Sequence, residues 1–449
     1  MGLSGIQIFK LLPKTNCKEC GVPTCLAFAM NLAAGKAELS ACPYVSDEAK
    51  ASLSEASAPP IRPVEIGAGA SAFKTGGELV MFRHEKTFFN PTGLALKISD
   101  SDSAEEVDQK LKCFADNQYD RVGLNLKGDL FALKAESGNA GTYAALVKKV
   151  RDASDAGLIL WSDNPTMVKA GLAERGGSKV LIYGANKSNL DAMIALAKEH
   201  GSPLVLMGNG LDELKELSDA ATKAELKDLV FDSGARTAGD QLRDQTAIRR
   251  LALQAKDRSF GFPTIAPVCD MAATPMQEAV IAAAGIAKYA GIIILSSFQG
   301  QFLFPLLLER LNIYTDPQRP MKTDEGLYAL NDATADSPVI VTSNFSLTYF
   351  IVSGEIENSR IPCWLFVKDT DGLSVLTAWA AGKFVGDAIG ESMKKAGCND
   401  KVANKKIVIP GLAAIISGDL EEELGSDWEV MIGPREASFI PAFLKQNFA

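Results

Sequence analysis

The chain has 449 residues, of which 47% are hydrophobic and 22% charged, so it can bury a large core, and its length predicts two or three domains. Its net charge of −9 argues against a surface that binds nucleic acid or an anionic membrane. No apolar run reaches the roughly 18 residues of a membrane span, and residues 1–14 lack the pattern of a signal peptide, so we expect a cytoplasmic protein.

Cysteines are concentrated at the beginning of the chain. Four of the eight, Cys17, Cys20, Cys25 and Cys42, follow the spacing Cys-x2-Cys-x4-Cys-x16-Cys. Four thiolates without a nearby histidine suit a 4Fe–4S cluster or a zinc ion. Three cysteines in one loop, a fourth after a predicted helix over residues 26–39, and a proline directly behind it favour the iron–sulfur cluster. Zinc ligation and purely structural or disulfide-bonded thiols are the alternatives.

A linker is predicted after the cysteines. Residues 54–72 are rich in Ala, Ser, Pro and Gly and poor in large apolar side chains. This composition is typical of a flexible connection, so we expect the cysteine domain, residues 1–58, to be tethered.

Apolar and amphipathic stretches alternate from residue 77 to residue 313. The expected strands are 78–83, 121–126, 157–162, 179–184, 203–208, 229–232, 264–268 and 291–296. The expected helices include 104–115, 143–153, 189–200 and 241–256. Apolar strands separated by helices indicate a parallel sheet that is covered on both faces. Eight such units predict a (β/α)8 barrel over residues 59–325, with an open doubly wound sheet as the alternative.

The same alternation continues on a smaller scale to the end of the chain. The expected strands are 338–342, 362–367, 406–410 and 428–432, and the expected helices are 346–357, 373–396, 413–424 and 437–445. The pattern predicts an open α/β domain over residues 326–449, in which ligands bind at the carboxyl ends of the strands.

Histidine is scarce. His84, expected at the end of the strand 78–83, and His200 are the only two in the chain. The sequence also lacks GxGxxG, GxxxxGK[ST] and GxSxG, the motifs of dinucleotide sites, P-loops and serine hydrolases.

Three motifs in this order resemble one known family. TNCKECGVPTCLAFA with the later ACP, VTSNFSLTYF (341–350) and KDTDGLSVLTAW (368–379) are similar to the large (gamma) subunit of the corrinoid iron–sulfur protein of the reductive acetyl-CoA pathway, also found in archaeal acetyl-CoA decarbonylase/synthase complexes. The resemblance covers essentially the whole chain.

The resemblance implies a methyl carrier. Its cobamide, in the Co(I) state, would accept a methyl group from methyltetrahydrofolate on a separate methyltransferase and deliver it to acetyl-CoA synthase. A 4Fe–4S cluster on the four cysteines would reactivate Co(II). The implied partners are a small barrel subunit, that methyltransferase, and carbon monoxide dehydrogenase/acetyl-CoA synthase, with no nucleic acid and no membrane.

The C-terminal domain fits a cobamide in physical terms. Without a histidine after residue 200, the lower ligand of cobalt would be water, the cofactor's own base, or nothing. We expect a base-off cobamide without a histidine ligand, because a weak lower ligand makes Co(II) easier to reduce. Because a corrin ring is edged with amides, small hydroxyl-bearing and glycine-containing loops suit it. The expected contacts are Ile340, Thr342, Ser343, Asn344, Ser346, Thr370, Asp371, Gly372, Leu373, Ser374, Gly411, Leu412, Gly433 and Pro434. Singly, the serines could be helix N-caps and the glycines turn residues.

Two other functions stay open from the sequence. The barrel itself could be a pterin-dependent methyltransferase, or the C-terminal domain could hold FMN in an iron–sulfur flavoprotein.

Overall fold

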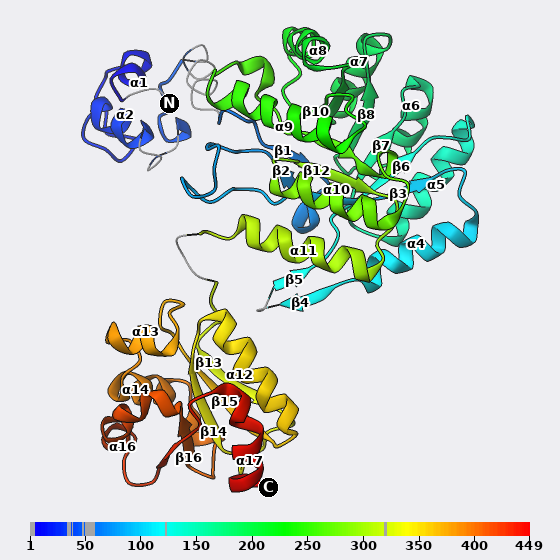
Figure 1. Ribbon diagram of the computed structural model, residues 1–449. Helices are drawn as coiled ribbons and strands as arrows, with labels where there is room; N and C mark the ends of the chain where they lie inside the picture. Colours follow the sequence, from blue (N-terminus) through cyan, green and yellow to red (C-terminus); the bar gives the residue numbers. More distant parts are fainter. Residues whose placement is uncertain are drawn as a thin grey trace. The chain divides into compact units, whose positions relative to one another are not determined.

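The computed structural model describes residues 5–33, 37, 39–46, 49, 59–121, 124–317 and 321–449 (Figure 1). The cysteine segment contains α1 (Gly5–Leu11), α2 (Cys25–Ala33) and the short 3-10 helix η1 (Leu39–Ala41). Ile8, Leu12 and Phe28 form a small core together with Cys25 and Cys42. The predicted helix 26–39 therefore corresponds to α2, which ends at Ala33, and residues 34–36 and 38 lie outside the described residues.

The linker prediction is wrong for residues 64–72. Strand β1 (Val64–Ile66) pairs in an antiparallel way with β2 (Phe73–Thr75). Val64 and Ile66, two residues apart and so on one face of the strand, are fully buried among the side chains inside the barrel. Burial of these two side chains, the pairing with β2 and a bridge between Gly67 and Lys179 order a segment of otherwise linker-like composition. Residues 54–58 lie outside the described residues.

The predicted barrel is confirmed. An eight-stranded, all-parallel sheet has the order β10-β9-β8-β7-β6-β3-β12-β11, and an isolated parallel bridge between Phe231 and Thr264 joins its two outer strands. The sheet is therefore nearly closed. Its strands are β3 (Gly93–Ser99), β6 (Leu130–Lys134), β7 (Gly157–Trp161), β8 (Leu181–Ala185), β9 (Leu204–Met207), β10 (Leu229–Asp232), β11 (Ile265–Pro267) and β12 (Ile292–Leu295).

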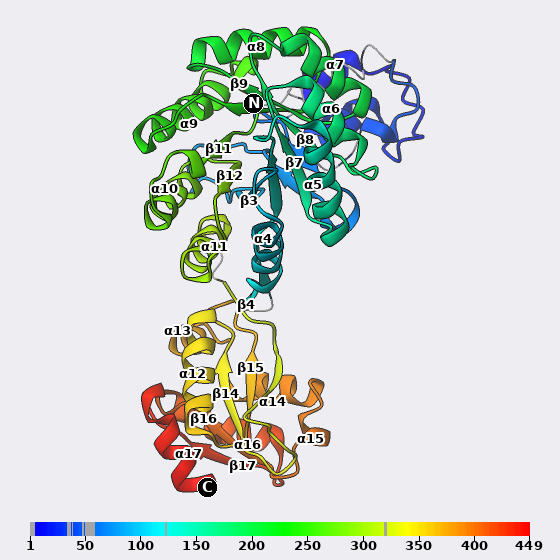
Figure 2. The same ribbon diagram turned by 90° about the vertical axis from the view of Figure 1, so that its right-hand side faces the viewer.

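Helices surround this sheet (Figure 2). They are α4 (Ala104–Asp116), α5 (Ala140–Ala153), α6 (Pro165–Ala173), α7 (Leu190–His200), α8 (Leu211–Lys223), α9 (Ala238–Leu253), α10 (Pro275–Ala287) and α11 (Gly300–Tyr314), with the 3-10 helices η2 (Gly69–Ser71), η3 (Arg258–Phe260) and η4 (Val268–Asp270). Polar side chains cap the first turn where the sequence provides them. At the start of α4, for example, Ser103 forms a complete capping box with Glu106.

The first two predicted barrel strands are wrong. Residues 78–83 form a loop, because the backbone oxygen of Val80 accepts from Arg249 at 2.6 Å and Glu78 pairs with the same guanidinium at 3.2 Å. His84 therefore does not end a barrel strand. Residues 121–126 belong instead to a small antiparallel pair, β4 (Tyr119–Arg121) with β5 (Leu124–Leu126), and residues 122–123 are not described. The true strands are β3 and β6.

The C-terminal part has a five-stranded sheet in the order β13-β15-β14-β16-β17. Its strands are β13 (Gly326–Leu330), β14 (Val339–Ser343), β15 (Cys363–Lys368), β16 (Lys406–Ile409) and β17 (Glu429–Ile432). The four predicted strands are confirmed and pair in parallel. Strand β13, which the sequence did not indicate, is an antiparallel edge strand, and its half-exposed residues give no alternating signal.

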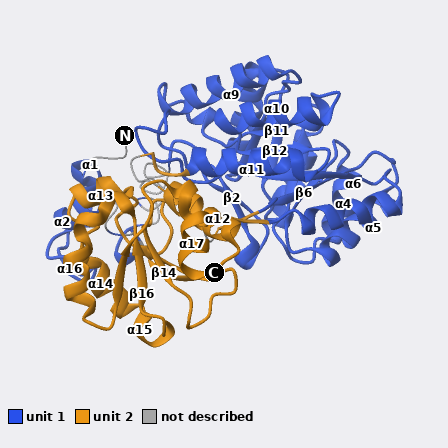
Figure 3. Ribbon diagram, turned by 60° about the horizontal axis from the view of Figure 1, so that its bottom comes forward, with its two compact units in different colours: residues 1–118, 127–314 blue, residues 119–126, 315–449 orange. Residues whose placement is uncertain are grey.

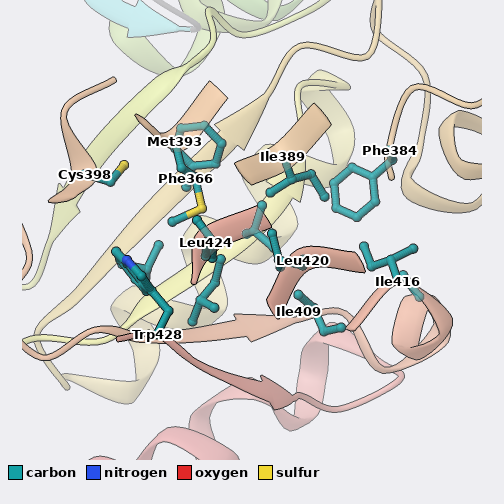
Figure 4. Close-up of a cluster of buried hydrophobic side chains, with 14 of the residues drawn as sticks. Phe366, Phe384, Ile389, Met393, Cys398, Ile409, Ile416, Leu420, Leu424 and Trp428 are labelled. Carbon is teal, nitrogen blue, oxygen red and sulfur yellow. The ribbon is translucent and has the colours of Figure 1, made fainter. Parts of the chain in front are cut away.

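Helices cover both faces of this sheet. They are α12 (Ser346–Ser359), α13 (Val375–Ala380), α14 (Gly386–Lys395), α15 (Cys398–Lys401), η5 (Gly411–Ile416), α16 (Ser417–Leu424), η6 (Ala437–Phe439) and α17 (Ile440–Phe448). The single helix predicted over residues 373–396 is wrong, because the chain breaks between α13 and α14 at Gly382, whose φ is +70°. Figure 4 shows one core, in which Phe366 and Ile409 of the sheet pack with Ile389, Met393 and Leu420 of the helices.

Contacts group the chain into two compact units, residues 1–118 with 127–314 and residues 119–126 with 315–449 (Figure 3). The predicted domain limits at residues 58 and 325 stay a prediction. Within the described ranges, no helix is both long and apolar enough to span a bilayer.

Candidate cofactor sites

The four predicted cluster ligands lie in the small cysteine domain. Cys25 and Cys42 are buried, and Cys17 and Cys20 are half-buried. Cys25 is the first residue of α2, where the positive end of the helix dipole favours a thiolate. Its Sγ accepts a hydrogen bond from the backbone N–H of Asn16 at 3.4 Å, and the Asn16 side chain accepts from the N–H of Cys25 at 2.8 Å.

The loop before α2 has an unusual backbone. Lys14, Asn16 and Lys18 all adopt positive φ, at 60°, 49° and 67°, and Gly21 follows at 77°. Left-handed residues alternating with ordinary ones turn successive N–H groups toward one side, which makes a concave site for anions and for iron–sulfur clusters. This backbone and the all-thiol donor set fit a 4Fe–4S cluster.

Ligation itself stays a prediction. Among the residues that the structure describes, no three or more His, Cys, Asp or Glu side chains are arranged to hold a metal ion.

The C-terminal sheet has one favoured place for a ligand. Its parallel strands β15-β14-β16-β17 have the flavodoxin-like order 2-1-3-4, in which the connections leave β14 and β16 toward opposite sides. At such a switch point a crevice opens beyond the carboxyl ends of these two strands.

A cavity lies at this switch point. It encloses ≈ 710 Å³ with its open mouth included, between β14, β16, α12, α13 and α17. Four predicted contacts line it: Ile340, Thr342, Leu412 and Pro434. The walls are largely apolar, with Val352, Val408 and Phe443 among the lining residues.

Three predicted contacts carry unused hydroxyl groups. Thr342, Ser343 and Ser346 are 1%, 0% and 7% exposed, and each hydroxyl oxygen lacks a hydrogen-bond partner. Buried polar groups are normally paired, so unpaired hydroxyls at a switch point indicate a polar ligand. Ser346 is the first residue of α12 rather than its N-cap, and Ser374 at the start of α13 contacts the Thr377 hydroxyl, at 3.0 Å, instead of capping the backbone.

Asn344 and Thr370 face each other across the two loops. The Asn344 Oδ1 accepts from the N–H and the hydroxyl of Thr370 at 3.0 and 2.9 Å, and from the N–H of Gly372 at 3.0 Å. The Asn344 amide group donates to Asp369 at 2.7 Å. The predicted contacts Asp371, Gly372 and Leu373 lie in the turn that these bonds hold.

The carboxyl group of Asp369 has a lowered pKa. Burial works to raise this pKa, but hydrogen bonds from the N–H of Asp371, from Lys322 and from Asn344 outweigh it. Asp369 is therefore an ionised acceptor at neutral pH.

Two of the three predicted glycines, Gly411 and Gly433, lie where the neighbouring loops meet. The Gly411 N–H donates to the backbone oxygen of Pro434 at 3.0 Å, and the Gly433 N–H donates to Ile409 at 2.9 Å. A Cβ on Gly411 would lie 2.5 Å from the Gly433 oxygen. Close backbone approach, not a left-handed φ, requires glycine at position 411.

Sequence reasoning missed the helical part of the cavity wall. Thr348 and Val352 of α12, four residues apart on one helix face, could have been found from their spacing. Ile440 and Phe443 depend on how α17 packs, and no local pattern reveals this.

The carboxyl edge of the barrel is different in chemistry. Lys134 lies 3.1 Å from Glu136 and 3.4 Å from Asp270, and Lys97 lies 3.5 and 3.9 Å from the same two carboxylates. Tyr183 donates to Asp232 at 2.5 Å. Asp232 also pairs with Arg236 at 2.9 Å, so each of these three carboxylates at the barrel edge has a cationic partner.

Comparisons with known proteins agree with the sequence motifs. A protein-family model described as CO dehydrogenase/acetyl-CoA synthase delta subunit matches residues 63–444, and a second, whose description names an Fe-S cluster, matches residues 12–44. The "Corrinoid/iron-sulfur protein large subunit" of Moorella thermoacetica is 46% identical over 100% of both chains. The "Acetyl-CoA decarbonylase/synthase complex subunit gamma" of Methanothermobacter thermautotrophicus is 34% identical over 99% of both chains.

A solved dihydropteroate synthase of Thermus thermophilus is 15% identical, with a TM-score of 0.39, over 53% of this chain and 100% of its own. At that score the similarity supports no functional argument.

Proposed function

We propose, since the chain belongs to the family that contains corrinoid/iron-sulfur protein large subunits and acetyl-CoA decarbonylase/synthase gamma subunits, that it is the cobamide-holding methyl carrier of such a system. The bound cobamide would supply a cobalt centre that receives a methyl group from methyltetrahydrofolate on a methyltransferase and releases it to acetyl-CoA synthase, and a 4Fe–4S cluster would supply the reactivating electron. The full-length identity of 46% to the Moorella protein carries this proposal.

The cysteine domain would hold the cluster. Cys17, Cys20, Cys25 and Cys42 are the proposed ligands, and the loop with the positive-φ residues Lys14, Asn16 and Lys18 would aim backbone N–H groups at its sulfur atoms. Such hydrogen bonds adjust the potential of an iron–sulfur cluster. The N–H of Asn16 already donates to the Cys25 sulfur. The N–H of Gly21 instead closes the loop by donating to the Lys18 oxygen at 3.0 Å.

The C-terminal switch point would hold the cobamide. The unpaired hydroxyls of Thr342, Ser343 and Ser346 suit the amide groups at the edge of a corrin ring. The apolar cavity between the sheet and helices α12 and α17 suits the less polar lower base. Because the sequence contains no histidine beyond residue 200, we propose a base-off cobamide without a histidine ligand.

The partners follow by analogy with the relatives. The name "large subunit" of the Moorella protein implies a small subunit there, and the archaeal names place the gamma subunit in a complex with decarbonylase/synthase activity. We propose corresponding partners here, together with the methyltransferase. A reducing cytoplasm suits a protein that carries low-potential cofactors and free thiols.

An anaerobic spectrum with metal counts tests the proposal. We expect about four iron atoms and one cobalt per chain, as the family cofactors require, and a base-off corrinoid absorption. A zinc-only count or a flavin spectrum would overturn it. Appreciable methyl transfer from methyltetrahydrofolate to free cobalamin by the chain alone would support the pterin-dependent methyltransferase instead.

Cysteine substitutions test the cluster ligands separately. Cys25→Ala and Cys42→Ala should lower the iron count and abolish the cluster absorption while cobalt stays bound. Cys398→Ala, at a buried cysteine in the C-terminal core, is the control and should keep the full iron count. Full iron in both ligand variants would contradict the assignment.

A further inference from the structure

We propose that Asn344 is a positioning residue for the cobamide edge and not a contact to the cofactor. This inference rests on the proposed function. Asn344 was predicted to contact the cofactor because it directly follows β14. Asn344, Ser343 and Ser346 are all buried, but the hydroxyls of the two serines have no partner, whereas both polar atoms of the Asn344 side chain are hydrogen-bonded. The hydrogen-bonding groups of Asn344 are turned toward the protein.

The acceptor of Asn344 is fully used. Its Oδ1 accepts from the N–H groups of Thr370 and Gly372, and the Thr370 hydroxyl, whose single proton is shared with the Leu373 oxygen, lies 2.9 Å away. A carbonyl oxygen has two lone pairs, and the two N–H groups occupy them, so a further donor from a ligand has no free position. The amide nitrogen donates to the carboxylate of Asp369, a charge-assisted bond that is stronger than a neutral one.

These bonds hold a turn that the backbone alone disfavours. Asp371 and Gly372 both have positive φ, 56° and 75°. A left-handed Asp is uncommon and needs support from its surroundings. Asn344 supplies this support from the neighbouring strand, because it binds the N–H groups on both sides of Asp371, and Asp369 accepts the N–H of Asp371 itself at 2.9 Å.

A third segment meets at the same residue. The Thr323 N–H donates to the backbone oxygen of Asn344 at 2.9 Å, and the Ser346 N–H donates to Met321 at 3.1 Å. Lys322 lies 3.3 Å from Asp369. Thr323, which is 6% exposed, carries another unpaired hydroxyl. Asn344 therefore joins three segments, and the free hydroxyls lie on or beside them.

A positioning role and a cofactor-contact role predict different responses when the side-chain types of Asn344 and Asp369 are exchanged. In Asn344→Asp, a carboxylate oxygen replaces the donor and faces Asp369, so the bond is lost and two like charges meet. Adding Asp369→Asn removes the like charge and restores one donor and one acceptor with the direction reversed. The Asp369 Oδ1 also accepts the N–H of Asp371, and an amide nitrogen in its place cannot. If Asn344 only positions the loops, the double variant therefore recovers in part. If Asn344 contacts the cofactor through its amide nitrogen, the double variant stays impaired.

The experiment uses the full chain, with and without cobamide, and two readouts. Hydrogen exchange of the cofactor-free chain reports the amides of Thr370 and Gly372. Cobamide retention and the EPR spectrum of bound Co(II) report the loaded site. For N344D we expect about tenfold faster exchange and about tenfold weaker retention with an altered spectrum, the size of one lost charge-assisted bond. N344D/D369N should recover about half of this loss on a logarithmic scale, to about threefold from the unaltered chain, because the N–H of Asp371 loses its acceptor.

Two further variants keep the test decisive. Asn344→Ala removes the side-chain bonds altogether and should speed exchange whether or not D369N is present. Asn404→Ala is the control, because Asn404 makes one side-chain bond, 2.6 Å to the Asp336 oxygen, before the start of β16. Unchanged exchange in N344D and N344A, or a double variant whose retention stays as low as that of N344D, would overturn the inference. If the unaltered chain binds no cobamide, the proposed function fails, and the exchange data still decide the role of Asn344.

Discussion

Replacing Gly411 with alanine should disrupt the ligand edge of the C-terminal sheet. Gly411 follows β16 and lies against the loop after β17. A Cβ at this position would lie 2.5 Å from the Gly433 oxygen, 2.9 Å from the Pro434 carbonyl carbon and 3.0 Å from the Arg435 nitrogen. All three are backbone atoms, so no side chain can rotate away, and the two loops must separate.

The cost can be worked out from these contacts. Forcing an extra methyl group into a packed site costs about 1–3 kcal/mol. Separation of the loops also breaks the 3.0 Å bond from the Gly411 N–H to Pro434, which contributes about 1 kcal/mol. The sum is about 2–4 kcal/mol, or a fall in melting temperature on the order of 10 °C for a domain of this size. Because Leu412 and Pro434 line the cavity, cobamide retention should fall as well.

Calorimetry of the full chain, followed by a cobamide retention assay, checks this expectation. Gly418→Ala is the matched control in the same sheet-and-helix unit. Gly418 lies on α16, nothing is within 4 Å of its Cβ position, and alanine there should be neutral or stabilising by about 0.5–1 kcal/mol. If G411A unfolds and binds cobamide like G418A, the reasoning from close backbone approach is refuted.

Two further expectations concern charged groups. Arg310→Met should cost about 3 kcal/mol, since it leaves the partly buried Asp129 without its cation and also removes bonds to the Thr92 and Lys127 oxygens. Lys395→Met is the control, because Lys395 and its partner Glu391 are both exposed, and it should change the free energy of unfolding by less than about 1 kcal/mol. Equal effects of the two substitutions in denaturant titrations would contradict this. Because the folded pKa of Asp369 lies below its ordinary value of 3.8, the stabilisation from its ionised form is complete above that value and is lost as the pH falls through the lowered pKa. Hydrogen exchange of the 369–373 loop should thus be independent of pH near neutrality, after correction for intrinsic rates, and a protection step near pH 6 would contradict the assignment.

The barrel could be predicted from the sequence where its strands are apolar throughout. Strands β7 and β12 are buried along their whole length and appear as unbroken apolar runs. Strand β3 was missed because Lys97 interrupts it, and that lysine is accommodated by Glu136 and Asp270, which belong to other strand ends. The apolar run at residues 78–83 was predicted as a strand but forms a loop, since the guanidinium of Arg249 from α9 binds its backbone. Both errors come from charged partners that are distant in the sequence.

The place of the candidate site could be predicted from the sequence, but not which of its residues have free polar groups and which bind other parts of the protein. Hydroxyl-bearing residues after β14 were predicted, and Thr342, Ser343 and Ser346 do lie buried at the switch point. That the amide of Asn344 is occupied by the neighbouring loop depends on the pairing of β14 with β15, which no single stretch of sequence contains. The part of the cavity wall that α17 contributes could not be predicted for the same reason. Which face of this helix points inward is defined only after the chain folds back.

The chain contains two carboxyl-terminal strand edges of the kind at which parallel α/β folds bind ligands. At the barrel edge, Lys97 and Lys134 lie within ion-pair distance of Glu136 and Asp270, so an uncharged ligand would have to displace interactions that are already satisfied. At the C-terminal edge, neutral hydroxyls are buried without partners, and Thr342, which carries one of them, lines an apolar cavity. Unpaired buried groups gain hydrogen bonds when a ligand arrives, whereas paired charges lose them. Gln241 and Gln245 of α9 also carry unpaired buried polar atoms, but the cavity that they line encloses ≈ 260 Å³, against ≈ 710 Å³ at the C-terminal edge. Fold alone would allow either edge to bind a cofactor, and the side chains and the available space favour the second.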